Sequence, residues 1–534
     1  MKQGLEPRVQ TSSTTDLRVQ ELRAKNVLLE QENQRLKSKY EALLEQIRLF
    51  QRQRFGASSE KFPADQQDLF NEAEALVDEE ELEAVAQGSI DVSEATATAR
   101  LQKKRGRQAL PPELPRIDVV HDVPAAQRCC PEGHALKVIG EAISEQLDII
   151  PAKIQVLRHI RKKYACPCCE AHVKTAELPP QPIPKSNASP GLLTYLVTAK
   201  FLDALPLYRQ SQILQRLGLD IARGTLAAWM IRCAELIQPL INLLQEQLRQ
   251  YDIQHMDETT LQVLKEDGKK AQSKSYLWVQ RGGPPDRQVI LFSYDPSRGQ
   301  HVADDLLTGY QGYLQTDGYV GYESVCAKNN LTQVGCFAHA RRKFDEALKA
   351  QGPKTKAGKA SKGLIYIQKL YRIEHLIKEL TPEERYQRRQ QQAVPLLDEI
   401  RAWLDTSLPQ VPPTSLTGKA LTYLDNQWDK LIRYCEDGRL DIDNNATERA
   451  IRPFVIGRNN WLFADTVAGA KASANLYSLI ETVKAHGLEP YRYLRHIFTE
   501  LPKAQSLEDI DQLLPWHVDK EQINQGWAKK VDGV

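Results

Sequence analysis

The sequence has no long hydrophobic segment. No apolar run approaches the length of about 20 residues that a bilayer-spanning helix needs, and the N-terminal MKQGLEPRVQ lacks the apolar core of a signal peptide. The 534 residues are 41% hydrophobic and 26% charged, which is ordinary for globular proteins with roughly two to four domains. We therefore expect a cytoplasmic protein with no membrane-bound part.

Charged residues and cysteines are unevenly distributed along the chain. Lysine and arginine are absent from residues 65–94, which carry eleven acidic residues, whereas residues 100–107 carry five bases. The formal net charge of +2 therefore hides a local segregation of charge. The cysteine count is nine, an odd number that argues against a disulfide framework. Five of the cysteines lie between Cys129 and Cys169, which indicates a metal site in a reducing compartment.

Glycine and proline are absent from residues 17–55, where large apolar residues recur every seven positions. The repeat consists of Leu22, Leu29, Leu36, Leu43 and Phe50. This pattern predicts a leucine-zipper-like coiled coil that joins the chain into a homodimer or higher oligomer. The alternative is a single amphipathic helix that packs on its own domain.

Residues 56–115 form an acidic tether followed by a basic linker. The tether has no steady hydrophobic period. In the linker, Lys104, Arg105 and Arg107 precede a proline-rich run, and an extended Arg-Gly-Arg segment can lie in a narrow minor groove of DNA. The alternative is an ordinary solvated linker.

Residues 116–178 combine clustered cysteines with short alternating hydrophobic patterns. We expect strands near residues 144–149 and 154–160. A structural zinc site needs four nitrogen or sulfur ligands, so this segment is a possible zinc-finger-like β module that presents Arg161 and Lys162 to DNA phosphates. The alternative is a small β module with reduced thiols. The candidate zinc ligands are Cys129, Cys130, His134, Cys166 and Cys169.

Residues 190–250 have helical periodicity interrupted at Gly218. A helix, a turn at this glycine and a second helix beginning near Ala222 suit a helix-turn-helix, with Arg223 and Arg232 facing DNA. The alternative is a helix pair of the kind found in any helical domain.

Residues 251–348 change to a period of two from Gln254 onwards. Three strands, a helix and a fourth strand are expected at 259–263, 276–280, 289–292, 302–307 and 312–316, in that order. Three antiparallel strands followed by a helix and a parallel fourth strand begin an RNase H-like α/β fold, in which the first and fourth strands are neighbours. Asp257 on the first strand and Asp317 after the fourth are therefore expected to converge.

A fifth strand is expected at 334–337, followed by a basic helix that carries Arg341, Arg342 and Lys343. Cys336 and His339 have the spacing of a metal half-site, but no second half-site is nearby, so we assign them to packing and DNA contact. Residues 349–436 are mostly helical in pattern and interrupt the core as a helical insertion.

The core resumes at residues 437–490 with DIDNNATERAIR. Asn444 or Asn445 is expected to cap a helix there, which places Glu448 in its first turn. Asp443 and Asp441 compete with Glu448 as the third acid. We prefer Glu448, because its longer side chain on a helix can reach the strand ends, whereas Asp443 suits a cap. Residues 491–534 form a C-terminal segment.

The segments HMDETTLQVL, YLQTDGYVGYE, GCFAHARRKF and DNNATERAIRPFVIGRNNWLFADTVAGA resemble DDE transposases of the insertion sequence sixty-six family, TnpC-type. The resemblance extends over nearly the whole chain. It implies that Asp257, Asp317 and Glu448 are the catalytic acids. Glu132 stands where the family commonly has a cysteine, which bears on zinc binding.

The resemblance also implies chemistry and partners. Carboxylates suit Mg²⁺ or Mn²⁺, and two ions roughly 3.5–4 Å apart would support hydrolysis at the element end and strand transfer by the released 3′-OH. The partners would be the double-stranded terminal repeats, target DNA and possible accessory proteins, in a nucleoid-associated assembly. The phosphate contacts would include Arg341, Arg342, Lys343, Arg449, Arg452, Arg458 and Lys471.

Two other functions fit parts of the sequence. A catalytically inert dimeric DNA-binding regulator would account for the zipper, finger and helix-turn-helix, but it leaves the three acids without a role. An RNase H-like nuclease that cuts RNA–DNA hybrids shares the core chemistry, but it accounts poorly for the N-terminal binding modules.

Overall fold

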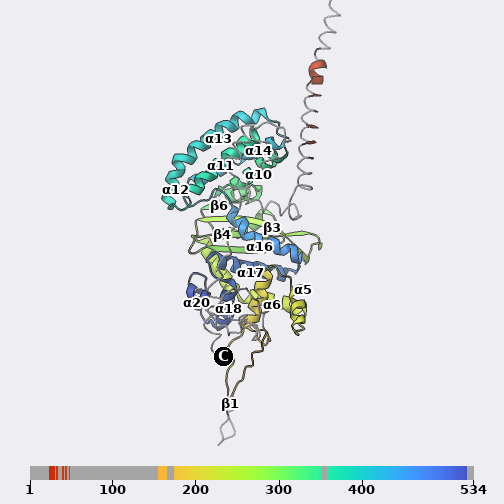
Figure 1. Cartoon of the computed structure of the whole chain (residues 1–534), viewed down its shortest axis with the longest axis vertical. Coiled ribbons are helices and arrows are strands. Elements are labelled where there is room, and N and C mark those ends of the chain that lie inside the picture. Colours follow the sequence, from red (N-terminus) through yellow and green to blue (C-terminus); the bar gives the residue numbers. More distant parts are fainter. Residues whose placement is uncertain are drawn as a thin grey trace, which may run out of the picture. The chain divides into compact units, whose positions relative to one another are not determined.

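The computed structural model of the chain (Figure 1) describes residues 154–164, 174–350 and 358–525, together with separate positions between Arg23 and Ile47. Residues 93–158 form a unit of their own, of which 154–158 are described. The predicted tether, basic linker and strand at 144–149 lie outside the described residues.

The described positions between Arg23 and Ile47 are helical. Leu29, Leu36 and Leu43 have exposed fractions of 47%, 58% and 57%. This agrees with the helix that the heptad pattern predicts and leaves its apolar residues accessible within one chain. The predicted partner, a second copy of the chain, stays a prediction. Leu22 and Phe50 lie outside the described residues.

The strand predicted at 154–160 does not form, and two strands of two residues each lie further along the chain. Residues 154–162 form no strand, and β1 (Lys163–Tyr164) pairs antiparallel with β2 (Lys174–Thr175). The prediction was wrong because alternation of apolar residues is insufficient without a hydrogen-bonded neighbouring strand. Val156 and Ile160 of this segment are 90% and 77% exposed.

Four helices precede the sheet. They are α4 (Pro190–Phe201), α5 (Leu207–Arg216), α6 (Arg223–Leu236) and α7 (Gln238–Arg249). Gly218 follows α5 with φ of +85°, a conformation that glycine adopts without a Cβ penalty. The predicted helix, glycine turn and second helix beginning beside Ala222 are therefore confirmed as elements.

A mixed sheet forms the centre of the fold, with strand order β5-β4-β3-β6-β7 and β8 paired to β3. The strands are β3 (Ile253–Lys265), β4 (Lys274–Gly282), β5 (Val289–Asp295), β6 (Tyr313–Gln315) and β7 (Thr332–Val334). The first three are antiparallel, whereas β6 is parallel to β3 and β7 is parallel to β6. The predicted adjacency of the first and fourth strands is confirmed.

The fifth strand ends three residues earlier than predicted. Beyond Val334, the backbone N–H of Gly335 donates to Lys430 O at 2.9 Å and that of Phe337 donates to Ile442 O at 3.1 Å. The backbone N–H groups of these residues therefore donate to residues at and after the end of the insertion rather than to β6. Phe337 is already the first residue of α10 (Phe337–Ala350).

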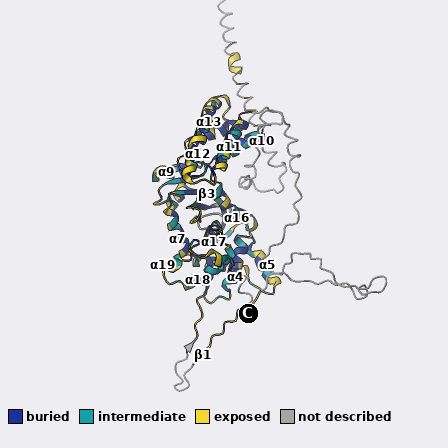
Figure 2. Ribbon diagram, turned by 60° about the vertical axis from the view of Figure 1, so that its left-hand side comes forward, coloured by how far each residue is buried: buried dark blue, intermediate teal, exposed yellow. Residues whose placement is uncertain are grey.

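The two faces of the sheet bury different helices (Figure 2). Leu261 of β3 and Val279 of β4 pack with α4–α7 and the helices that follow the insertion. On the other face, Met256 and Trp278 pack with α8 (Gln300–Leu306) and α9 (Val320–Asn329). The alternation of β3 and β4 side chains between two cores follows from the period of two in a strand.

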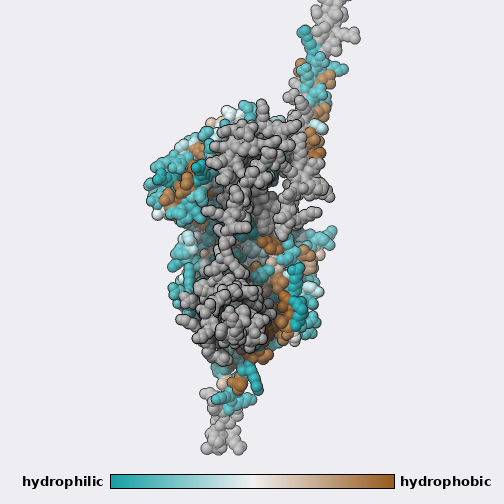
Figure 3. All heavy atoms as spheres, in the orientation of Figure 1, coloured by the Kyte–Doolittle hydropathy of each residue, from teal (hydrophilic) through white to brown (hydrophobic). Residues whose placement is uncertain are grey.

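The described part of the insertion, residues 358–436, is mostly helical, as predicted for this region. It contains α11 (Lys359–Ile377), α12 (Pro382–Arg388), a π-helix η3 (Arg389–Ala393), α13 (Val394–Ser407), η4 (Leu408–Gln410), α14 (Leu416–Asn426), α15 (Trp428–Ile432) and η5 (Arg433–Cys435). All of these helices except α12 contribute to a core shared with α10, which includes Phe344 and Trp403. The visible face of α12 and α13 is mostly hydrophilic (Figure 3).

After the insertion, α16 (Asn445–Trp461) crosses β3, and β8 (Ala464–Thr466) pairs with the far end of β3. The chain then forms α17 (Val467–Ala485), α18 (Pro490–Glu500), η6 (Leu501–Lys503), α19 (Leu507–Asp511) and α20 (Lys520–Gln525). Ser478 and Thr482 of α17 accept hydrogen bonds from the backbone of β5 at 2.7 and 3.0 Å, which covers that edge of the sheet. No helix in the described part of the chain combines the length and apolar character needed to cross a bilayer.

Candidate active site

The register of the sheet brings Asp257 and Asp317 together. In the parallel β3–β6 pair, His255 lies opposite Gln315. Asp257, inside β3, and Asp317, just after β6, each lie two residues beyond this pair. They are therefore at the same level on neighbouring strands, which are about 4.8 Å apart. The convergence inferred from the order of elements thus has its physical basis in the register.

Glu448 reaches the same place from a helix. It lies in the first turn of α16, as predicted, and its residue is 8% exposed. The pKa of the Asp257 carboxyl is raised well above its usual range, first by burial and then by the negative charges of Glu258, Asp317 and Glu448. Asp317 and Glu448 are therefore both close enough to Asp257 to oppose its ionisation.

Asp317 has its own stabilising contacts. Its Oδ1 accepts a hydrogen bond from the backbone N–H of Tyr319 at 2.9 Å. Burial raises the pKa of the Asp317 carboxyl, while the Tyr319 N–H and the charge of Arg298 act in the opposite direction. The carboxyl of Asp317 is thus buried beside Asp257, with Arg298 as a nearby positive charge. Grouped carboxylates of this kind are an electrostatic setting in which a divalent cation binds.

Asn444 ties the start of α16 to the first strand. His255 Nδ1 donates to Asn444 Oδ1 at 3.1 Å, and Asn444 Nδ2 donates to Met256 O at 3.1 Å. The prediction that Asn444 or Asn445 caps this helix was wrong, because Asn444 makes no capping bond with its side chain. Its amide is used instead to join two segments separated by 189 residues.

Asp443 supplies the cap that the asparagines do not. Its Oδ1 accepts from the backbone N–H of Asn445 at 3.0 Å, and its Oδ2 accepts from Asn445 Nδ2 at 2.9 Å and from Tyr371 Oη at 2.7 Å. Both carboxylate oxygens are therefore engaged in the loop and with the insertion. This supports Glu448 over Asp443 as the predicted third acid.

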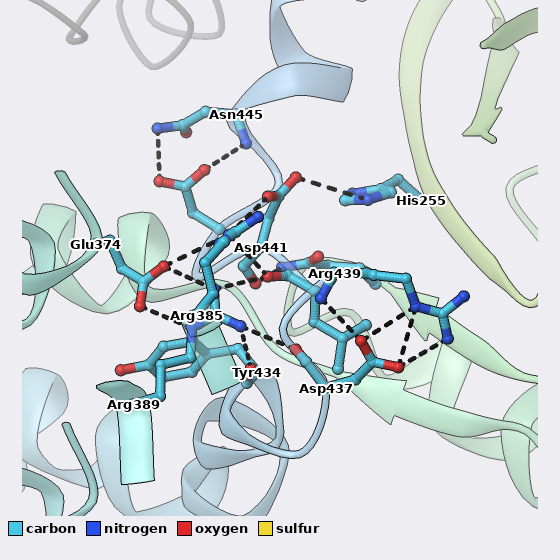
Figure 4. A network of polar contacts seen from close by, with 12 residues as sticks. His255, Glu374, Arg385, Arg389, Tyr434, Asp437, Arg439, Asp441 and Asn445 are labelled. Atoms are coloured by element: carbon cyan, nitrogen blue, oxygen red, sulfur yellow. Dashed lines mark hydrogen bonds and ion pairs between the residues drawn. The ribbon is translucent and has the colours of Figure 1, made fainter. Parts of the chain in front are cut away.

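A buried arginine of the insertion holds the loop that leads to α16 (Figure 4). Arg389 is 0% exposed and forms two hydrogen bonds with the Glu374 carboxylate, at 2.9 and 2.6 Å. Its guanidinium also donates to the carbonyl oxygens of Tyr434, Asp437 and Leu440 at 2.7, 2.9 and 2.8 Å. The five donors of a guanidinium can satisfy such a set in one plane.

A fourth acid, Glu258, was missed by the sequence analysis. Its side chain is 2% exposed, pairs with Arg298 at 2.6 Å and accepts a hydrogen bond from Tyr322 Oη. Burial raises the pKa of the Glu258 carboxyl, and Tyr322 and Arg298 oppose this shift. The only signal in the sequence was its position next to Asp257, which alone predicts the opposite face of the strand.

The first turn of α10 faces Glu448. His339 Nε2 lies 3.9 Å from Glu448 Oε1, and Arg342 lies 3.6 Å from Oε2. Burial, together with the charges of Arg342 and Lys343, lowers the pKa of His339 to about 3. This imidazole is therefore neutral at physiological pH and can act as a hydrogen-bonding group or metal ligand.

The predicted DNA contacts fall into three groups. Arg161, Lys162, Arg223, Arg232, Arg449 and Lys471 are exposed. The half-buried ones are Arg341, Arg342, Lys343, Arg452 and Arg458. The third group, Lys104, Arg105 and Arg107, lies outside the described residues, as do the predicted zinc ligands Cys129, Cys130, His134, Cys166 and Cys169.

Some of the half-buried bases already have partners within the protein. Arg458 donates to Thr260 Oγ1 at 2.7 Å, and the Lys343 ammonium lies 4.8 Å from the ring centroid of Tyr423. Of the exposed bases, Arg232 pairs with Glu235 at 2.8 Å, and Arg223 is the first residue of α6. Which of these bases contact DNA stays a prediction.

A mixed α/β fold in which two neighbouring strands and one helix bring three acids together defines a candidate carboxylate metal centre. The chain belongs to the group of proteins described as the Transposase IS66 family, whose model matches residues 185–472. Further models match over 478–516 (IS66 C-terminal element), 127–170 (zinc-finger binding domain of transposase IS66) and 42–119 (Transposase C of IS166 homeodomain). The family resemblance seen in the sequence is thus confirmed.

Relatives in Sinorhizobium fredii (strain NBRC 101917 / NGR234) cover most of the chain. The uncharacterized protein y4jD is 33% identical over 445 residues, which are 79% of this chain and 86% of the relative. The uncharacterized protein y4qI is 28% identical over 493 residues, 89% of each chain. The uncharacterized protein y4hP is 29% identical over 468 residues, 83% of this chain and 84% of the relative. No solved structure matches the chain significantly.

Proposed function

We propose that this protein is a DDE DNA transposase with an RNase H-like core, which binds the ends of its element and performs metal-dependent strand cleavage and strand transfer. The observation that carries the proposal is the register that sets Asp257 and Asp317 side by side, with Glu448 close enough to raise the pKa of Asp257. Membership of a transposase family supports it. An inert regulator would have no use for this costly grouping of buried acids.

The donor set suits a hard divalent cation. Oxygen ligands from Asp257, Asp317 and Glu448 would hold Mg²⁺ or Mn²⁺, and the mutual repulsion of these carboxylates would be relieved by its charge. When bound, such ions supply Lewis-acid stabilisation of the attacking and leaving oxygens in phosphoryl transfer. Zinc in the segment matched as a zinc-finger domain is a separate proposal that rests on the family match.

The protein's own residues would position the reactants. Asp257 and Asp317 are fixed by the sheet, so they define where the scissile phosphate lies. Glu448 approaches from α16, whose exposed Arg449 is the next residue and can contact a DNA backbone. Recognition of the terminal repeats would fall to the α5–α6 pair and the finger segment, with target DNA entering the same site. The predicted homodimer would let one protein assembly hold both element ends.

Cleavage of element-end DNA tests the proposal. We expect purified full-length protein to nick a labelled duplex that contains its terminal repeat in Mg²⁺ or Mn²⁺ and not in EDTA. Asp257→Asn should bind the same duplex with unchanged affinity in EDTA and should not nick it. Nicking of an RNA strand in a hybrid in preference to the DNA duplex would favour the nuclease. Binding without any metal-dependent nicking would favour the inert regulator.

A further inference from the structure

Cys336, His339 and Glu448 form a compact group at the junction of two helices. Cys336 immediately precedes α10, His339 lies in its first turn, and Glu448 lies in the first turn of α16. One potential ligand atom from each residue lies within 4.8 Å of the others. The set mixes sulfur, imidazole nitrogen and carboxylate oxygen, which are the ligand types of Zn²⁺.

The imidazole of His339 has a buried nitrogen atom that makes no hydrogen bond to the described residues. Its Nδ1 is buried and has no hydrogen-bond partner among the described residues. A buried ring nitrogen without a partner costs free energy unless a ligand occupies it or a change of ring orientation supplies one.

The sulfur atom of Cys336 accepts hydrogen bonds from backbone N–H groups. Asn444 N donates to Sγ at 3.2 Å, and the backbone N–H of His339 also bonds to the thiol. A cation binds the thiolate form of cysteine and releases the thiol proton. The backbone N–H of Asn444 would then donate to the thiolate.

We propose that Cys336, His339 and Glu448 bind a borderline divalent cation such as Zn²⁺, at a site distinct from the predicted finger. Tetrahedral coordination needs ligand atoms roughly 3.4–3.8 Å apart. The observed spread of up to 4.8 Å therefore closes with side-chain rotations of about 1 Å. The cation would join the start of α10 to the start of α16 through one oxygen of Glu448. The other oxygen, which lies 3.6 Å from Arg342, would remain for the Mg²⁺ or Mn²⁺ of the proposed catalytic site.

The groups around the site favour a cation overall. Glu448 and a Cys336 thiolate carry negative charge, and the Asp443 carboxylate lies close enough to influence the thiol. The opposing charges are Arg342, at 3.6 Å from Glu448 Oε2, and Lys343, whose charge also acts on His339. Three protein ligands leave the fourth position of a tetrahedral zinc to water.

Cobalt binding by the full-length protein tests the site without DNA. Co²⁺ reports tetrahedral coordination through its visible absorption bands and thiolate ligation through a near-ultraviolet charge-transfer band. At free Co²⁺ that saturates the wild-type chain, Cys336→Ser and His339→Gln should each bind about one equivalent less per chain. The finger segment contributes equally to every sample. Matched controls are Cys326→Ser and Cys435→Ser, which change buried free thiols elsewhere and should keep the full stoichiometry.

Two variants keep the experiment decisive. If Cys336→Ser does not fold, His339→Gln reports on the same site from a half-buried position. Folded Cys336→Ser or His339→Gln protein that retains the cobalt stoichiometry and spectrum of Cys326→Ser would overturn the proposal. The measurement involves no DNA and no cleavage, so its failure is distinguishable from failure of the proposed transposase activity.

Discussion

The strand acids and the helix acid of the candidate site are held in different ways. Asp257 and Asp317 are positioned by backbone register, because each follows the paired residues of β3 and β6 by two positions. Glu448 is positioned by side chains that come from distant parts of the chain, through Asn444 to β3 and through Asp443 to Tyr371 of the insertion. The first arrangement is intrinsic to the sheet, whereas the second depends on the insertion being folded.

This difference suggests a role for the insertion besides separating the two halves of the core. Arg389 and Tyr371 contact the loop of residues 434–443, which directly precedes α16. Loss of these contacts should displace Glu448 and leave the two strand acids where they are. The predictions below separate the two arrangements, beginning with the largest effect.

Removal of the helix acid should have the largest effect on activity. Glu448→Gln should reduce metal-dependent cleavage of element ends by about 10³-fold or more, because a bound metal ion contributes several kcal/mol and each 1.36 kcal/mol is about tenfold in rate. Glu448→Asp, which keeps the charge on a shorter side chain, should also be strongly impaired. Single-turnover cleavage of labelled end DNA measures both.

The matched comparison for that experiment is Asp443→Asn. This variant keeps most of the size and the hydrogen-bonding capacity of a cap residue, so it should retain most of the cleavage rate. If Asp443→Asn abolishes cleavage while Glu448→Gln spares it, the third acid is Asp443 and the assignment to Glu448 is wrong.

Breaking the insertion's clamp should give the largest effect on stability. Arg389→Met removes five hydrogen bonds and leaves the Glu374 carboxylate with Arg385, at 3.7 Å, as its remaining charged partner. Loss of one partner of a buried ion pair costs about 3–5 kcal/mol in the free energy of unfolding, measurable by urea denaturation. Arg388→Met changes the neighbouring exposed arginine and should stay within about 0.5 kcal/mol of wild type.

A double variant sharpens this result. Replacing both partners, Arg389→Met with Glu374→Leu, should recover part of the loss, because the carboxylate that keeps only the 3.7 Å contact with Arg385 is then gone. The three carbonyl oxygens that Arg389 serves would still lack a donor. Equal stability of Arg389→Met and wild type would show that the clamp does not hold the loop.

Asn444→Ala should have a smaller effect, confined to the attachment of α16 to β3. It removes the hydrogen bonds to His255 and Met256 O, and one unsatisfied buried group costs about 1–3 kcal/mol. Cleavage should fall together with stability, because Glu448 is four residues further along the helix. Asn460→Ala, on the exposed end of α16, is the control. A loss of equal size in both variants would argue against a specific anchor.

The strand order of the sheet could be predicted from the sequence, whereas the side-chain contacts that hold the candidate site could not. The order of elements was sufficient to place β3 beside β6, because a helix returning to a parallel strand restricts the topology. The roles of Asn444, Arg389 and Glu258 were not predictable, since each depends on a partner far away in the chain. Arg389 pairs with Glu374 and three carbonyls only after the insertion has folded. The strand prediction for residues 154–160 was wrong for the same reason, because periodicity does not reveal whether a neighbouring strand is present.

The smallest predicted effect contrasts a strand acid with the helix acid in the absence of metal. The folded-state pKa of Asp257 is raised, so its contribution to stability is present below the unfolded pKa of about 3.9 and is lost as pH rises through the folded pKa. At pH 7 in EDTA, Asp257→Asn should therefore be more stable than wild type, with a Tm higher by about 2–4 °C for each kcal/mol of relieved repulsion. The gain should vanish near pH 4, and Mg²⁺ should raise the Tm of wild type more than that of the variant.

Two further variants make that comparison specific. Asp286→Asn, on the exposed turn between β4 and β5, should leave Tm unchanged at both pH values. Glu448→Gln should give no gain, because it loses the attraction of Arg342 at 3.6 Å as well as the repulsion from Asp257. Thermal melts from pH 4 to pH 8, with EDTA or Mg²⁺, measure all four proteins. If the gain in Tm of Asp257→Asn did not depend on pH, the other two acids would not affect the ionisation of Asp257. The proposal that the three acids are grouped would then lack electrostatic evidence.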